Sequence, residues 1–300
     1  MIQYIDRKSG ALCEEKIYGR GALLLFYGDG LFSKILYYTL LPLFARVPFF
    51  SWLYGKLQKT RASHAKIAPF IAAYGIDATE FEQSEFDSFN DFFIRKLKTT
   101  RRPVAPGIDA LAAPADGRYL LYPTFDKFFV KGQEFSLQEF LQDSVLARRF
   151  EEGSMLIARL CPIDYHRFHF PCSGFAGKPR PIQGPLYSVN PIALKKWIAI
   201  LSENKRVITE IETEQFGTML YVEIGATAVG TIQQTFAPES QVIKGAEKGY
   251  FEFGGSCLVL LFEKGRVRFD GDLVANTARG IETLCRVGEA IGVACKLNGS

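Results

Sequence analysis

The sequence predicts an α+β fold, with a helical N-terminal region over residues 1–102 and a mainly antiparallel β core with a few helices over residues 103–300. Before Pro103 the chain carries long apolar runs with helical spacing. After Pro103 it changes to short β-type runs separated by Gly and Pro turns. Apolar residues make up 48% of the 300 residues and charged residues 23%, a composition that allows a large core and argues against disorder.

The first helices are expected in the most apolar part of the chain, residues 22–54. Charges interrupt its apolar runs, and none reaches the ~18 to 20 residues that span a bilayer. Between residues 16 and 60, six Lys and Arg face one acid, and Trp52 and several tyrosines accompany them. Such helices suit the headgroup boundary of an anionic membrane, so we expect a membrane-surface region. The alternative is that they pack as core helices.

Two further helices are predicted before the β core. Apolar residues fall on one face of residues 67–74, and Gly75 ends that helix. Residues 89–98 form a second amphipathic pattern, for which Asp87 or Ser88 is the expected N-cap. The helical region therefore continues almost to residue 102.

Within the β core, two helices have clear start signals. Ser136 and Glu139 form a capping box, and Asn190 before Pro191 combines an N-cap with proline at the first helical position. The remaining apolar runs predict strands. The strands are expected at residues 207–214, 219–224, 227–236, 257–263 and 266–269.

Charge and cysteine content argue against several classes of protein. The net charge is +4 without a block of like charges, so no nucleic-acid partner is expected. The six cysteines are scattered without a C-x-x-C, which favours reduced thiols in a protein that faces the cytosol. The first residues lack the charged start, apolar run and cleavage site of a secretory signal.

Two histidines lie close together in the run Cys161–Pro171. His166 and His169 have Asp164 and Arg167 beside them. No further Cys, His or Glu stands at ligand spacing, so the H-x-x-H pair is a weak metal signal and no metal site is expected. Imidazoles titrate near neutrality and suit acid–base chemistry, although either one alone could be structural. In a flat strand they face opposite sides, so they share a pocket only if the chain bends.

Asp116 and Ser256 lie in glycine-containing turns. Asp116 precedes Gly117, which Asx-turn chemistry also explains. Ser256 follows two glycines between β-type runs, where its hydroxyl could reach the carbonyl of Gly255. The alternative for Gly-Gly-Ser is a bulge in a buried strand. Asp116, a histidine and Ser256 could form a triad, although spacing alone does not show that they meet.

Five short segments, taken in chain order, point to one family. They are Phe89–Lys98 with Arg102–Pro103, Pro114–Gly117, Asp164–Pro171, Gly225–Gly230 and Lys244–Ser256. They read FNDFFIRKLK with RP, PADG, DYHRFHFP, GATAVG and KGAEKGYFEFGGS. This set, spread over about residues 86 to 292, resembles the phosphatidylserine decarboxylases, whose processing site lies in the last segment.

The resemblance implies a self-processing proenzyme. Asp116, His169 and Ser256 match the family's cleavage triad, in which Ser256 attacks the carbonyl of Gly255 and the bond between them breaks. Ser256 then becomes a pyruvoyl group, the covalent cofactor. The two products are a β chain and an α chain, residues 1–255 and 256–300.

The resemblance also implies the reaction and its setting. The pyruvoyl carbonyl forms a Schiff base with phosphatidylserine and takes up the electrons released as CO2 leaves. His166 or His169 is the expected proton donor, and the product is phosphatidylethanolamine. Because the substrate is a membrane lipid, the helices are expected to dock on an anionic membrane, peripherally and at the cytoplasmic side of the cell membrane. The processed chains are expected to form an α/β heterodimer, with a higher oligomer left open.

Cys257 departs from the family pattern, which usually has threonine after the processed serine. We expect processing to proceed through Ser256, with its rate left open. One alternative is a serine hydrolase that uses Ser256, His169 and Asp116, but no G-x-S-x-G elbow is present. The other is an inactive lipid-binding homologue, against which the retention of all four reactive residues argues.

Overall fold

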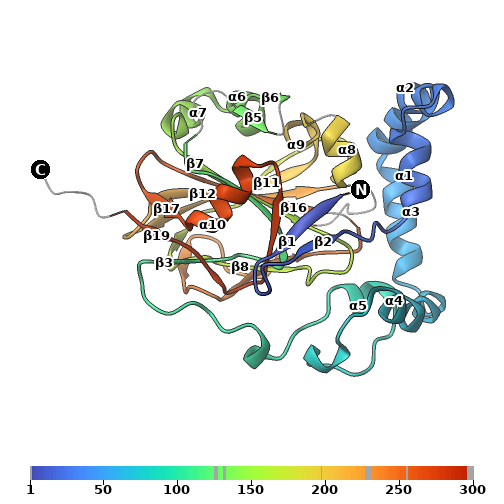
Figure 1. Ribbon diagram of the computed structural model, residues 1–300, viewed down its shortest axis with the longest axis horizontal. Helices are drawn as coiled ribbons and strands as arrows, with labels where there is room; N and C mark the ends of the chain where they lie inside the picture. Colours follow the sequence, from blue (N-terminus) through green and yellow to red (C-terminus); the bar gives the residue numbers. More distant parts are fainter. Residues whose placement is uncertain are drawn as a thin grey trace, which may run out of the picture.

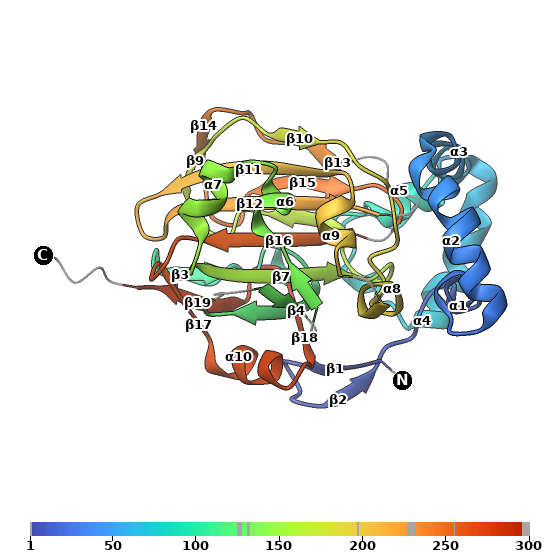
Figure 2. The ribbon, with the colours of Figure 1, turned by 90° about the horizontal axis from the view of Figure 1, so that it is seen from above.

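The centre of the molecule is an 11-stranded sheet (Figures 1 and 2). The computed structural model describes residues 2–124, 128–130, 133–196, 198–226, 232–254 and 256–295. The sheet has the strand order β14-β9-β11-β12-β16-β7-β4-β18-β1-β2, with β10 paired to β11. Its strands are β14 Ser240–Val242, β9 Gly174–Ala176, β11 Arg206–Thr213, β12 Gly217–Gly225, β16 Ser256–Phe262, β7 Ser154–Leu160, β4 Gly117–Tyr122, β18 Glu282–Cys285, β1 Gln3–Asp6, β2 Leu12–Glu14 and β10 Arg180–Ile182.

The pairing is antiparallel, as the sequence predicts. In the described part of the chain, β1 and β18 form the one parallel pair, and every other pair is antiparallel. The predicted strands are found at β11, β12, β16 and β17 (Val267–Phe269). Of the predicted strand 227–236, the part Ile232–Gln234 is strand β13, and residues 227–231 lie outside the described residues.

Strand β16 shows why the sheet is buried on both faces. Alternate residues of a strand point to opposite faces. Cys257, Val259 and Leu261 pack in one apolar cluster, whereas Leu258, Leu260 and Phe262 pack in another. Helices cover the first face, and two small three-stranded sheets together with α10 (Gly271–Ala278) cover much of the second (Figure 1).

The covering elements are short. The small sheets comprise β13, β15 Glu247–Phe251 and β8 Arg167–His169; β17, β19 Ala290–Ala294 and β3 Ala110–Ala112; and β5 Phe128–Val130 with β6 Gln133–Phe135. The helices are α6 Leu137–Leu141, α7 Ser144–Phe150, α8 Pro191–Lys196, α9 Ile200–Glu203 and α10 Gly271–Ala278. Both predicted start signals are confirmed, because Ser136 accepts from the amide of Glu139 and Asn190 accepts from the amide of Ile192.

The first long helices form a separate layer at one end of the sheet (Figure 1). The helical elements are α1 Arg20–Tyr27, α2 Leu31–Arg46, α3 Pro48–Gln58, η1 Arg61–Lys66, α4 Ile67–Tyr74, η2 Ala78–Glu80, α5 Phe89–Phe93 and η3 Thr99–Arg101. Helix α4 ends as predicted at Gly75, whose positive φ of 63° suits glycine. The chain before α1 belongs to the sheet, through β1 and β2.

Helix α5 is shorter than predicted, since it ends at Phe93 and not at Lys98. Ser88 is its N-cap and accepts from the amide of Asp91. Beyond the helix, the buried guanidinium of Arg95 donates to the carbonyls of Ile163 and Asp164. A longer amphipathic helix would require Arg95 on its solvated face, but its side chain is buried and held by these two hydrogen bonds. The sequence pattern does not reveal this contact, because the partners are far along the chain.

Helices α1–α3 expose an unusual amount of apolar surface. Of the 20 large apolar side chains exposed in the described residues, 14 lie between Leu24 and Leu57. Leu31 and Phe32 are 78% and 64% exposed, and Tyr38 is 76% exposed. Among the described residues, no helix is both long and apolar enough to cross a membrane.

Candidate active site

Ser256 is the first residue of β16, at the end of the sheet nearest the helical layer (Figure 2). It is fully buried and lies opposite Gly225 of β12 and Leu160 of β7. Its Oγ has no hydrogen-bond partner among the described residues. Leaving a buried hydroxyl unpaired costs about 1–3 kcal/mol, so this hydroxyl does not serve stability.

The segment before Ser256 is a turn between β15 and β16. Gly254 has a φ of 142°, which favours glycine, and Gly255 lies outside the described residues. From Ser256 onward the pairing with both neighbouring strands runs without a register shift. In the described residues, β15 ends at Phe251 and β16 begins at Ser256, so Ser256 starts a new strand. The alternative of a bulge within one continuous strand is not seen there.

His166 is fully buried, and a backbone carbonyl holds its ring. Its Nδ1 lies 2.9 Å from the carbonyl oxygen of Asp164, which can only accept, so Nδ1 carries the proton. Nε2 then has a lone pair, and it has no partner among the described residues. The ring packs on Phe93 with 3.8 Å between centroids, and burial lowers the pKa of His166 to about 3. The imidazole is therefore neutral.

His169 lies at the end of β8, in a different environment. Its Nδ1 is 2.9 Å from the carbonyl oxygen of Gly245, and its Nε2 is 3.3 Å from the hydroxyl of Tyr165. Burial lowers the pKa of His169, although the Gly245 carbonyl and the charges of Glu247 and Asp116 oppose the shift. The ring borders a cavity of about 250 Å³. His169 thus presents a neutral ring whose Nε2 can accept a proton.

Asp116 is held by other groups than a histidine. Its carboxylate accepts from Arg102, with 2.8 Å between Nη2 and Oδ2, and from the amide of Val287 at 2.8 Å. Glu80 binds the other side of Arg102 at 3.0 Å. The amide of His169 donates to the carbonyl of Pro114, which places the Asp116 turn beside β8.

The structure therefore gathers the predicted residues into two groups. His169 lines one cavity together with Arg102 and Val287, and these two residues bind the carboxylate of Asp116. His166 and Ser256 lie in the buried interior with unpaired polar atoms. Between these four described residues, no hydrogen bond joins Asp116 to His169 or His169 to Ser256. The triad and the roles of both histidines stay predictions.

A buried network of charges, which the sequence analysis missed, supports this region. Arg159 binds Glu15 at 2.6 Å and Glu282 at 2.5 Å, and all three are buried. Arg118 binds Asp164, whose carbonyl orients His166. Burial alone raises the pKa of Glu15, but the charge and hydrogen bonds of Arg159 outweigh it and hold that pKa low. The sequence does contain a signal for this network, namely Arg118 and Arg159 within apolar strands. A buried arginine requires a carboxylate partner, so these positions indicate buried ion pairs.

An apolar cavity of about 430 Å³ lies between the helical layer and the end of the sheet that holds Ser256. Leu23, Phe26, Leu41 and Phe44 line it from α1 and α2. Two residues line the cavity from the sheet side. Leu160 is paired with Ser256 across the strands, and Gly254 directly precedes Gly255. The cavity thus connects the exposed helices with the candidate cleavage site.

Ser256 has a buried, unpaired hydroxyl, and its neighbours Leu160 and Gly254 line an apolar cavity, an arrangement that suits a reactive group acting on an apolar molecule. The family model described as phosphatidylserine decarboxylase matches residues 89–293, and the chain belongs to this family. It is 47% identical over 298 residues to the phosphatidylserine decarboxylase proenzyme of Chlamydia muridarum (strain MoPn / Nigg), covering 96% of each chain. The proenzyme of Chlamydia pneumoniae is 44% identical over 295 residues, covering 97% of this chain and 96% of its own.

Proposed function

We propose that this chain is a proenzyme that cleaves itself between Gly255 and Ser256 and then decarboxylates phosphatidylserine to phosphatidylethanolamine. The observation that carries the proposal is the buried Ser256 Oγ without a partner, at the start of β16, in a member of this family. A fold that leaves such a group unpaired makes it available for reaction.

The cleavage uses this chain's own groups. His169 Nε2 takes the proton of Ser256 Oγ, and Oγ attacks the carbonyl of Gly255, so an ester replaces the amide. The ester then loses its carboxylate from Cβ by elimination, which leaves dehydroalanine at residue 256. Its hydrolysis releases ammonia and leaves a pyruvoyl group. The β chain keeps residues 1–255 and the α chain keeps residues 256–300.

The residues around Ser256 fit a small polar group. Ser256 Oγ and His166 Nε2 are both buried polar atoms without a partner among the described residues, so this interior has hydrogen-bonding groups left for another polar group. The pyruvoyl group supplies an electrophilic ketone, which none of the twenty side chains offers. His166 is neutral at rest, and an anionic substrate beside it raises its pKa, so it can take up the proton that is later delivered to Cα.

The helical layer provides access for the lipid. Side chains such as Leu31, Phe32 and Tyr38 insert into the headgroup boundary of an anionic membrane, and the apolar cavity receives the acyl chains from there. The protein then works as a peripheral membrane enzyme at the cytoplasmic side of the cell membrane. The two processed chains stay together because β16 of the α chain lies between β12 and β7 of the β chain.

The intact mass of the purified protein tests the proposal. We expect two chains, the smaller one blocked to Edman sequencing, and release of CO2 from phosphatidylserine vesicles. Ser256→Ala should leave one uncut, inactive chain of about the full 33.6 kDa. A single wild-type chain without decarboxylation would favour an inactive lipid-binding protein. An uncut wild-type chain that cleaves lipid esters would point to a serine hydrolase.

A further inference from the structure

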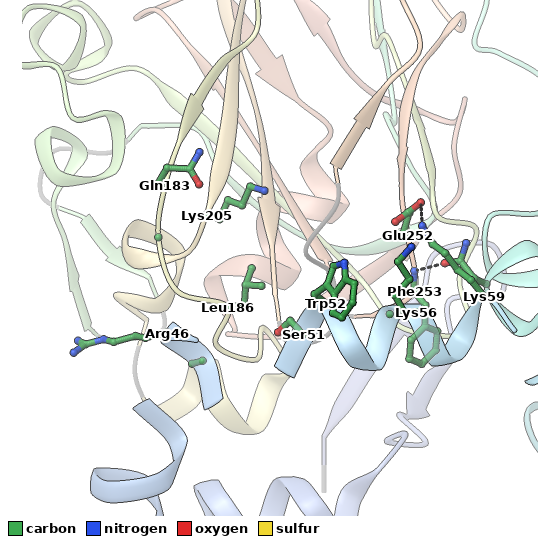
Figure 3. A pocket seen from close by; sticks show the side chains of 14 residues that line it. Arg46, Ser51, Trp52, Lys56, Lys59, Gln183, Leu186, Lys205, Glu252 and Phe253 are labelled. Atoms are coloured by element: carbon green, nitrogen blue, oxygen red, sulfur yellow. Dashed lines mark hydrogen bonds and ion pairs between the residues drawn. The ribbon is translucent and has the colours of Figure 1, made fainter. Parts of the chain in front are cut away.

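A second cavity, also of about 430 Å³, lies between α3 and the segment around β10 and β11 (Figure 3). We call it the basic cavity, because four cations line it and Glu252 is the one carboxylate among its lining residues. The cations are Arg46, Lys56, Lys59 and Lys205. They come from the ends of α2 and α3 and from the residue before β11, and the guanidinium of Arg46 points away from the other lining side chains (Figure 3).

The carboxylates near these cations do not balance them. Lys59 pairs with Glu252, with 2.7 Å between Nζ and Oε1. Glu203 of α9 faces Arg46 from outside the cavity. Lys56 lies over the ring of Trp52, with its Nζ 5.8 Å from the centroid, and has no ion pair among the described residues. The cavity therefore presents net positive charge, which favours an anionic occupant.

The basic cavity adjoins the apolar cavity. Both are lined by Ser51 and Phe253, and the apolar cavity continues to Gly254. Asn90 accepts from the amide of Phe253 at 2.9 Å, which holds this segment in place. One wall of the basic cavity is thus formed by Glu252 and Phe253, which lie just before the proposed cleavage site.

We propose that the basic cavity binds the phosphodiester of the phospholipid substrate, an inference that rests on the proposed function. When the serine amine of the substrate reaches residue 256, only Cβ and one ester oxygen separate its Cα from phosphorus. The phosphate must therefore lie close to Ser256, and its glycerol side must continue toward apolar surface. The basic cavity offers cations at that place, and the shared wall at Ser51 and Phe253 leads to the apolar cavity.

The test removes charge from the cavity and leaves the cleavage machinery intact. Lys56→Gln is compared with Lys34→Gln, which removes an exposed cation of α2 outside the cavity. The substrate is dihexanoyl phosphatidylserine below its micelle concentration, so that adsorption to a membrane does not contribute. We expect normal self-cleavage by intact mass, a KM about tenfold higher and a kcat within about twofold for Lys56→Gln, and no change for Lys34→Gln.

Dihexanoyl phosphatidylglycerol has the phosphodiester of the substrate but lacks its serine. It therefore tests whether the phosphate alone is bound at the substrate site. Competitive inhibition, with an inhibition constant raised by Lys56→Gln, supports a site for the substrate phosphate. An unchanged KM, an equal rise in Lys34→Gln, or non-competitive inhibition would overturn the proposal. If the wild-type protein does not decarboxylate, the proposed function fails. A 31P NMR titration of Ser256→Ala with dihexanoyl phosphatidylglycerol, with and without Lys56→Gln, then still shows whether Lys56 binds a phosphodiester.

Discussion

The interior of the sheet and the helical layer depart from the usual distribution of residues in opposite ways. The sheet buries charged groups, such as Arg118 and Arg159, which proteins normally keep in water. Helices α1–α3 expose apolar groups, such as Leu31 and Phe32, which proteins normally bury. The buried charges have partners within the chain, whereas the exposed apolar side chains require a surface outside it.

Ser256 lies at the border between these two regions. Its strand belongs to the rigid sheet, and the residues around it line the cavity that opens toward the helices. The comparison predicts that substitutions in the sheet act on stability and that substitutions in the helical layer act on lipid binding. The following variants test this separation, beginning with the largest expected effect.

Arg159→Met should destabilise the sheet strongly, because it leaves the carboxylates of Glu15 and Glu282 buried without their shared cation. The expected loss is about 3–5 kcal/mol in the free energy of unfolding. Urea unfolding, measured in the uncut Ser256→Ala background so that one chain unfolds, provides the value.

Lys264→Met is the matched control for a charge pair. It removes the partner of Glu152 in a pair whose side chains are 71% and 53% exposed. Its cost should be small compared with that of Arg159→Met, because water screens an exposed pair. Equal losses in the two variants would show that burial of the network does not matter.

His166 makes stability depend on pH. Its pKa is about 3 in the folded chain and about 6.5 when unfolded, so only the unfolded chain takes up this proton as pH falls below about 6.5. The contribution of the neutral His166 to the free energy of unfolding is complete above about pH 6.5 and is lost as the pH falls toward 3. His166→Asn retains a donor for the Asp164 carbonyl and should reduce the loss of stability between pH 7 and pH 5 by about 2 kcal/mol. An unchanged profile in His166→Asn would contradict the buried neutral ring.

Leu31→Ser/Phe32→Ser should weaken binding to anionic vesicles about tenfold or more without lowering the melting temperature. Both side chains are largely exposed, so the fold loses little buried area, but the membrane loses two apolar anchors. Vesicle flotation and a thermal melt measure the two effects separately. Val145→Ser on α7, where the valine is 69% exposed, is the control and should retain binding. A lower melting temperature with unchanged binding would instead favour helices that pack as core elements.

Local signals in the sequence predicted elements best where their cause is local. Gly75, Ser136 and Asn190 end or begin helices through their own conformations and hydrogen bonds, and the structure has them there. The end of α5 depends on Arg95 reaching the carbonyls of Ile163 and Asp164, far along the chain, so local periodicity could not reveal it.

The candidate site divides in the same way. Motifs predicted roles for Asp116, His166, His169 and Ser256, because catalytic chemistry depends on residue type, and these roles stay predictions. The partners of these residues are backbone carbonyls and a distant arginine: Asp164 and Gly245 for the imidazoles, and Arg102 for Asp116. Every residue has a backbone carbonyl, so the sequence does not show which carbonyl binds which imidazole. Only the fold determines these contacts.

Cys257 should matter least, although it follows the cleaved bond directly. Alternation along β16 sends its side chain to the face opposite Ser256, into the apolar cluster with Val259 and Leu261. Cys257→Thr places a hydroxyl in that cluster and not beside Ser256 Oγ. We therefore expect self-cleavage within about threefold of wild type, and a small loss of stability of about 1 kcal/mol from the buried hydroxyl. The conversion of freshly synthesised proenzyme, followed by gel over time, gives the rate. A tenfold acceleration would mean that the side chain at 257 takes part in the cleavage, and that the two faces of β16 are not chemically separate at its first residues.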